Sequence, residues 1–206
     1  MKLLFATTNP AKIKKYSEKL KERNIELLTL KDIGMNLHIE ENGKNAIENA
    51  YLKAFKYYEA TKIPTIGMDN SLYIEGLPEE KQPGTHVKRV NGQELTDEEM
   101  IKYYTDLVNQ YGGKLIAKWI YGIVLYDGEN IKKYSYSKSH FYFVGKACEK
   151  RNPGYPLDSI SIIPEFNKYM LELTEDEKKI YKKENEKDDV IDFIVKNLKD
   201  IQGANV

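Results

Sequence analysis

A short loop near the N-terminus carries residue types that could hold an anion. An apolar run over residues 3–6 is followed by Thr7, Thr8 and Asn9, and Lys12 comes three residues later. Asn9 can cap a helix whose apolar positions would be Ile13, Tyr16 and Leu20. The backbone N–H groups and the dipole at a helix N-terminus bind phosphate, and a nearby ammonium strengthens such a site. An ordinary helix cap is the alternative that these residues alone leave open.

Four acidic residues form a candidate metal centre: Glu40, Glu41, Glu48 and Asp69. Mg²⁺ prefers oxygen ligands and usually bridges protein carboxylates to a substrate phosphate. Asp69 directly follows the apolar run 65–68, so we expect it where a buried strand ends, the usual place for function in α/β sheets. Glu48 is equally well explained as a solvated or helix-pairing residue, and Glu40 and Glu41 as loop charge.

The spacing of apolar residues predicts the elements that must position these groups. Helices are expected to begin at Asn9, Asn45, Thr96 and Thr174, and a last one carries its apolar face on residues 190–198. Apolar runs predict strands over residues 3–6, 25–30, 65–68, 72–75 and 160–163. Two longer strands, 114–127 and 130–144, are joined by Asp127-Gly128, which favours a hairpin, and residues 76–92 read as a loop.

This pattern indicates an α/β protein with an elongated mixed β-sheet and helices on both sides. With 206 residues, the chain fits one domain, 1–206, made of two lobes that flank a central cleft. We expect the loop from Thr8 to Lys12 and the Asp69 carboxylate to face each other across that cleft.

Composition excludes several classes of protein. Lysine plus arginine and aspartate plus glutamate both number 32, so no net charge attracts nucleic acid or an acidic membrane. The single cysteine, Cys148, allows no internal disulfide, and the scattered histidines form no zinc motif. The apolar run 119–126 is too short to cross a membrane, and the first residues lack the length of a signal peptide, so we expect a cytoplasmic protein.

Taken in chain order, these segments resemble the inosine triphosphatase-like family of pyrophosphatases, which act on non-standard purine nucleoside triphosphates. Residues 6–12 resemble the family's Thr-Gly-Asn-x-x-Lys motif, with Thr8 in place of the glycine. Residues 68–72 stand where the family has acidic-Asp-Ser-Gly-Leu. The loop 41–43 with the helix 47–54 resembles the family's acidic loop and following helix, and Pro83-Gly84 matches its later turn. Residues 154–158 resemble the family's Gly-Phe-Gly-Tyr-Asp motif, and residues 172–178 match its Glu-Leu-x-x-Glu-Glu-Lys motif.

The resemblance implies a fold with a central nucleotide-binding cleft and hydrolysis of a triphosphate to a monophosphate and pyrophosphate. It implies Mg²⁺ as cofactor, held by Glu41 and Asp69, with Asp69 also the general base. Phosphates would be bound by Thr8, Asn9 and Lys12, and the base and sugar by Tyr155, Asp158 and Lys178. Tyr155 replaces a phenylalanine that lies against the purine, and either ring can stack there. A homodimer is also implied, and Tyr103-Tyr104 could supply contact area.

Two departures from the family pattern affect these expectations. Met68 stands where the family has a second acidic residue, although neighbouring strand residues point to opposite faces, so Met68 need not face the ligand of Asp69. The family's Ser-His-Arg falls on Lys182, Lys183 and Glu184. Lysine does not reproduce the planar, bidentate contacts of arginine, so recognition of the purine is expected to differ.

Several functions stay open on the sequence alone. The first is an active Mg²⁺-dependent pyrophosphatase with altered base preference. The second is an inosine or xanthosine triphosphatase of the family's usual kind, and the third is a nucleotide-binding relative without activity. A nucleic-acid-binding module would use Lys132, Lys133 and the tyrosines of the hairpin, but alternation along a strand is more typical of one solvated and one core face.

Overall fold

A computed structural model describes residues 1–185 and 189–203, without the side chains of 11, 184, 185 and 199–203. Glu184, at the arginine position of the family motif, therefore has no described side chain. The chain forms two compact units. The first unit contains residues 1–70, 121–136 and 187–206, and the second contains residues 71–120 and 137–186.

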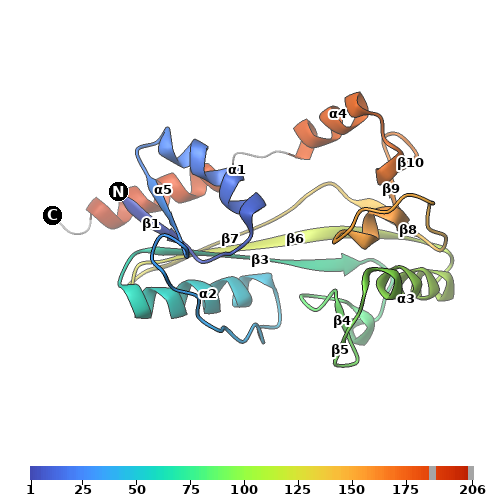
Figure 1. Cartoon of the computed structure of the whole chain (residues 1–206), viewed down its shortest axis with the longest axis horizontal. Helices are drawn as coiled ribbons and strands as arrows, with labels where there is room; N and C mark the ends of the chain where they lie inside the picture. Colours follow the sequence, from blue (N-terminus) through green and yellow to red (C-terminus); the bar gives the residue numbers. More distant parts are fainter. Residues whose placement is uncertain (186–188, 204–206) are drawn as a thin grey trace. The chain divides into compact units, whose positions relative to one another are not determined.

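The order of elements confirms the predicted mixture of strands and helices (Figure 1). The helices are α1 (Pro10–Lys21), α2 (Ala46–Thr61), α3 (Asp97–Gln110), α4 (Glu175–Asn185) and α5 (Asp189–Gly203), with short 3-10 turns η1 (Glu79–Lys81), η2 (Pro156–Ile160) and η3 (Met170–Glu172). The strands are β1 (Lys2–Phe5), β2 (Glu26–Thr29), β3 (Thr65–Ile74), β4 (Arg89–Val90), β5 (Gln93–Glu94), β6 (Lys114–Tyr126), β7 (Ile131–Ser137), β8 (Phe141–Val144), β9 (Ser161–Ile163) and β10 (Lys168–Tyr169).

The main sheet is mixed, as predicted. Its strand order is β10-β9-β8-β6-β3-β1-β2, and β7 pairs with β6 beside this path. β1 runs parallel to β2 and to β3, whereas β8 is antiparallel to β6 and to β9. β4, at the end of the region 76–92 that was predicted as a loop, pairs with β5 just beyond it in a separate small hairpin.

In the first unit, helices cover both faces of the sheet because β1 alternates its side chains between two cores. Leu3 and Phe5 pack with α1 and α5 on one face, whereas Leu4 and Ala6 belong to a cluster with Tyr57 of α2 on the other (Figure 1). The predicted alanine stripe of α2 lies directly on the sheet. A Cβ on Gly67 would lie 1.9 Å from the Ala50 carbonyl oxygen, so only glycine allows this close contact.

The second unit has its own core between α3 and the strands. Tyr104 and Val108 of α3 are buried with Phe143 of β8. The predicted capping box at the start of α3 is present. The Thr96 hydroxyl accepts a hydrogen bond from the backbone N–H of Glu99, and the Glu99 carboxylate accepts one from the backbone N–H of Thr96. The box predicted before α4 is also present, between Thr174 and Glu177.

Two strand boundaries differ from the prediction. The two strands predicted over 65–68 and 72–75 are one continuous strand, β3, because polar partners on α2 satisfy the Asp69 side chain within it. The second hairpin strand, predicted over 130–144, is two strands: β7 pairs with one part of β6 and β8 with residues 114–117. The polar residues between them, Lys138, Ser139 and His140, supply no apolar side chain to either core.

β7 shows the two-faced alternation expected of a core strand. Tyr134 and Tyr136 stack on each other, and Tyr134 also stacks on Phe193 of α5. The tyrosines that a nucleic-acid-binding module would need are therefore engaged in packing. In the part of the chain that the structure describes, no helix has the length and apolar character that crossing a membrane requires.

Candidate active site

The N-terminal loop is both a helix cap and an open polar surface. The backbone N–H of Lys12 donates to Asn9 Oδ1 at 3.2 Å, so Asn9 caps α1 as predicted. The backbone N–H of Asn9 donates to Thr7 Oγ1 at 3.2 Å, and Thr8 is exposed at the tip of the loop. The cap and the anion site thus use different atoms and do not exclude each other.

Lys12 places its ammonium beside β3. Its Nζ lies 3.5 Å from the Met68 carbonyl oxygen. Burial lowers the pKa of Lys12, and the Lys53 ammonium lowers it further, while Asp69 and Glu41 act in the opposite direction. These interactions bring Lys12, Lys53, Glu41 and Asp69 into one electrostatic cluster inside the first unit.

The predicted carboxylates Glu41 and Asp69 meet through a lysine that sequence reasoning did not select. The Lys53 Nζ lies 2.7 Å from Glu41 Oε2 and 3.3 Å from Asp69 Oδ1. The side chains of Lys53 and Asp69 are only 14% and 13% exposed, whereas that of Glu41 is 45% exposed. The ammonium therefore sits between one nearly buried and one accessible carboxylate.

Asn49 fixes the other oxygen of Asp69. Its Nδ2 donates to Asp69 Oδ2 at 2.9 Å, and its Oδ1 accepts the backbone N–H of Gly43 at 2.8 Å. Asn49 is 1% exposed, so the Gly43 contact decides which end of the amide points at Asp69. A Cβ at Gly43 would lie 2.6 Å from Asn49 Oδ1, so glycine is required for this approach.

The remaining acidic candidates stand outside this cluster. Glu48 caps its own helix: its carboxylate accepts the backbone N–H of Lys44 at 2.7 Å and the Asn45 side-chain amide at 3.2 Å. The geometry therefore supports a structural role for Glu48 at the start of its helix and not a role as a metal ligand. Glu40 is exposed on the preceding segment.

Met68 does not face the acidic cluster. Its side chain is 2% exposed and packs in the core formed with α1 and α5, while Asp69 contacts residues of α2. The alternation expected along a strand therefore separates the two side chains. Met68 therefore takes no part in the contacts of Asp69 with Asn49 and Lys53.

The donor set near Lys53 fits a magnesium ion only in part. Among residues 1–185 and 189–203, no three His, Cys, Asp or Glu side chains are grouped closely enough to hold a metal. Mg²⁺ needs only one or two protein carboxylates when substrate phosphates and waters supply the other ligands, and Glu41 and Asp69 meet that requirement. The chemistry fits a metal that arrives with a polyphosphate.

A cavity of about 390 Å³ adjoins this cluster within the first unit. Thr7, Thr8, Glu41 and Lys53 line it, and His38 lies on the same wall. Its hydroxyl, imidazole and ammonium groups suit an anionic ligand better than an apolar one. The loop, the lysine and Glu41 are thus reached from the same space.

The base-side candidates Tyr155, Asp158 and Lys178 belong to the second unit. Tyr155 is 59% exposed, which leaves its ring accessible for stacking. Asp158 accepts a hydrogen bond from Asn152 Nδ2 at 2.9 Å. Burial raises the pKa of Asp158, and the Asn152 contact offsets part of that rise.

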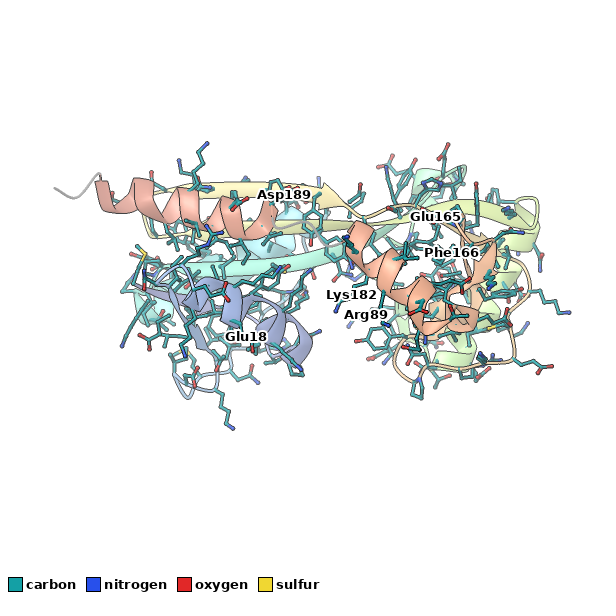
Figure 2. All side chains as sticks on the ribbon, turned by 90° about the horizontal axis from the view of Figure 1, so that it is seen from above. Glu18, Arg89, Glu165, Phe166, Lys182 and Asp189 are labelled. Carbon is teal, nitrogen blue, oxygen red and sulfur yellow. The ribbon has the colours of Figure 1, made fainter. Side chains whose placement is uncertain are left out.

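Lys178 is engaged on its own helix. Its Nζ pairs with Glu175 Oε1 at 2.7 Å, one turn away on α4, so the alternative of a charged surface residue has direct support. Lys182, labelled on α4 in Figure 2, and Lys183 are exposed in the same unit. The structure therefore does not bring Lys178 into a described contact with Tyr155 or Asp158.

Sequence reasoning missed Asn49 and Lys53 because each was assigned only to the polar side of a helix. Their separation of four residues places them on one face of α2, which also carries the alanine stripe next to β3. A lysine and an asparagine flanked by small residues on a sheet-facing helix were the available signal. The site therefore depends on α2 as much as on β3.

Comparisons with known proteins point to a single family. A model of the Ham1 family matches residues 3–185. A dITP/XTP pyrophosphatase of Aquifex aeolicus is 32% identical over 188 residues, covering 86% of this chain and 88% of that protein. One of Bacillus subtilis is 31% identical over 178 residues, covering 85% and 87%.

Solved structures agree at the level of the fold. The Ham1 protein of Staphylococcus aureus superposes with a TM-score of 0.71 at 20% identity, over 97% of this chain and 98% of that one. A HAM1 protein from Coxiella burnetii gives the same TM-score at 21% identity, over 97% and 99%. The resemblance read from the motifs is confirmed: this chain belongs to the Ham1 family.

Proposed function

We propose that this protein hydrolyses nucleoside triphosphates with non-standard purine bases to the monophosphate and pyrophosphate. The observation that carries the proposal is the cluster around Asp69: a carboxylate fixed by buried Asn49, next to Lys53 and Glu41, with Lys12 of the N-terminal loop nearby. Relatives that cover most of the chain are named dITP/XTP pyrophosphatases, which supports the same substrate class.

In this proposal the loop and the lysines hold the polyphosphate. The capped N-terminus of α1 offers Thr8 and backbone N–H groups, and Lys12 adds an ammonium that lies 3.5 Å from the Met68 carbonyl oxygen of β3. Lys53 lines the same cavity as Thr8, so an anion there can contact both. Together these groups orient the triphosphate for cleavage between its α and β phosphates.

Asp69 acts as the general base. A water oxygen forms a bond to the α phosphorus, and the water's proton passes to an Asp69 oxygen. The bond from the α phosphorus to the oxygen that bridges it to the β phosphorus breaks, so that pyrophosphate leaves. Asn49 keeps one oxygen of Asp69 fixed during this step. Glu41 and Asp69 would hold Mg²⁺, which neutralises charge on the phosphates when bound.

The preferred base is expected to differ from that of typical relatives. Tyr155 offers an exposed ring and Asp158 a carboxylate held by Asn152, so stacking and hydrogen bonding to a purine are both available. Lys182 and Lys183 replace the serine and histidine expected from the motif, and Lys178 must leave Glu175 to contact a nucleotide. These changes also favour the alternative function, nucleotide binding without turnover.

A screen for pyrophosphate release separates the candidates. Purified protein with Mg²⁺ is given ITP, dITP, XTP and the four standard triphosphates, and pyrophosphate is measured by an enzyme-coupled assay. We expect release with at least one non-standard purine triphosphate. Nucleotide-dependent thermal stabilisation without any pyrophosphate would instead support the non-catalytic function.

The homodimer and the cytoplasmic location expected from the sequence stay predictions. Light scattering coupled to size-exclusion chromatography measures the first directly, and a mass equal to that of one chain would contradict it. Fractionation of cells that express the tagged chain measures the second.

A further inference from the structure

We propose that Lys53 is a built-in counter-cation: its ammonium occupies the cation position between Glu41 and Asp69 in the free protein, and the polyphosphate draws it away when a metal enters. The inference rests on the proposed function only for the identity of the metal-bound substrate. It concerns the charge balance of the site, which can be measured without turnover.

The geometry places one nitrogen in contact with both carboxylates. Lys53 Nζ lies 2.7 Å from Glu41 Oε2 and 3.3 Å from Asp69 Oδ1, so the two carboxylates face each other across the ammonium. These are the oxygens that a divalent cation would need. A metal cannot share this position with the ammonium, because two cations would then contact the same oxygens.

Charge counting leads to the same conclusion. Glu41 and Asp69 carry two negative charges, and Lys53 and Lys12 carry two positive ones, so the cluster is neutral without a metal. A divalent cation added alone would meet two ammonium groups. A metal that arrives with a polyphosphate brings enough negative charge to pair with both of them.

The cavity beside Lys53 offers its ammonium an alternative position. Lys53 and Glu41 line the cavity that also contains Thr8, so a phosphate bound there lies within reach of the flexible lysine stem. Asp69 keeps its orientation when Lys53 leaves, since Asn49 holds Oδ2 and is itself held by Gly43. The oxygen that becomes free is therefore Oδ1, together with Glu41 Oε2.

The test measures Mn²⁺ binding in the absence of nucleotide, from the electron paramagnetic resonance signal of free Mn²⁺. Lys53→Met keeps the length of the side chain and removes its charge. We expect Mn²⁺ to bind this variant at least about tenfold more tightly than the wild type, since a cation at contact distance has been removed. Lys56→Met, three residues further along α2 at an exposed position, is the matched control and should equal the wild type.

A second measurement uses tripolyphosphate in EDTA, followed by calorimetry. Lys53→Met should bind tripolyphosphate at least about tenfold more weakly than the wild type, because the ammonium that pairs with phosphate is gone. Opposite changes in metal and phosphate affinity distinguish a counter-cation from an ordinary structural ion pair, whose loss would not strengthen metal binding. Circular dichroism establishes that the variant is folded.

Unchanged or weaker Mn²⁺ binding by folded Lys53→Met would overturn the inference. Lys53→Gln replaces it if the methionine variant does not fold. Should neither variant fold, the wild type decides: tight Mn²⁺ binding without nucleotide contradicts the inference, and its absence up to millimolar Mn²⁺ agrees with it. Failure of the proposed function would show instead as absence of pyrophosphate release, and it leaves the Mn²⁺ titration interpretable.

Discussion

Replacement of Asn49 tests how the buried end of the site is built. Asn49→Leu keeps a similar side-chain volume but removes the donor to Asp69 and the acceptor for the Gly43 N–H. Both partners lose a hydrogen bond at a position that is 1% exposed in the wild type. An unsatisfied buried polar group costs about 1–3 kcal/mol, and a charged one costs more, so we expect a loss of about 3–5 kcal/mol in the free energy of unfolding.

The same change should affect catalysis beyond its effect on stability. Among the described residues, Asn49 and Lys53 are the ones that hydrogen-bond the Asp69 carboxylate, so without Asn49 this carboxylate can turn away from the attacking water. We expect kcat to fall by about a hundredfold or more in the fraction that is folded at 25 °C, in line with the loss of an orienting hydrogen bond to a catalytic group. KM should change less, since the hydrogen bonds described for the Asn49 side chain involve Gly43 and Asp69 and not the residues proposed to bind phosphate.

Urea denaturation followed by circular dichroism measures the stability, and pyrophosphate release measures the rate. Lys56→Leu, on the exposed side of the same helix, is the control and should stay near the wild type in both assays. A loss of stability below about 1 kcal/mol for Asn49→Leu, the size of one ordinary hydrogen bond, would refute the reasoning. Asn49→Asp separates the two contacts, because it retains the acceptor for Gly43 and places a second carboxylate against Asp69.

Two further perturbations address Lys12 in the first unit and Asp158 in the second. Lys12→Met should raise KM at least about tenfold with a smaller effect on kcat, because one phosphate-binding charge is removed; an unchanged KM in steady-state kinetics would remove Lys12 from the phosphate site. Asp158 has a raised pKa because of burial, so its protonated form is favoured on folding and ionisation costs stability as the pH rises through the folded pKa. The melting temperature of Asp158→Asn should therefore exceed that of the wild type at pH 8, and this excess should disappear at pH 4. A difference in melting temperature between variant and wild type that is the same at both pH values would contradict this account.

Local signals were sufficient to predict most elements of the fold. Thr96 with Glu99, and Thr174 with Glu177, mark helix starts because the capping contacts involve residues only three positions apart. The short apolar run 3–6 likewise predicted a buried strand, and Leu3, Leu4 and Phe5 of β1 are buried. Such features depend on neighbours in sequence, and the structure reproduces them.

The errors arose where distant segments decide the outcome. The polar stretch after Met68 indicated the end of a strand, yet β3 continues because Asn49 and Lys53 of α2 satisfy Asp69 in its interior. The strand after the hairpin was predicted to be continuous, but separate parts of β6 pair with β7 and β8. Pairing between remote strands leaves no mark in a window of neighbouring residues.

The structure brings three of the residues predicted for the site close together, but it does so through residues that were not selected from the sequence. Glu41, Asp69 and Lys12 were selected from the sequence, and the structure places them in one electrostatic cluster. The residue that connects the carboxylates, Lys53, and the residue that orients Asp69, Asn49, have ordinary helix-surface spacing. The close approach of α2 to β3 at Gly67 turns this face of the helix toward Asp69, and a window of neighbouring residues does not reveal it.

The central claim is that Asp69 drives hydrolysis of a non-standard purine triphosphate to a monophosphate and pyrophosphate. The most direct measurement quantifies pyrophosphate and orthophosphate released from ITP, dITP and XTP by the wild type and by Asp69→Asn, with Mg²⁺ and with folding monitored by circular dichroism. We predict pyrophosphate as the product of the wild type and a loss of at least about a thousandfold in kcat for the folded variant. Orthophosphate as the product, or wild-type turnover by folded Asp69→Asn, would contradict the account.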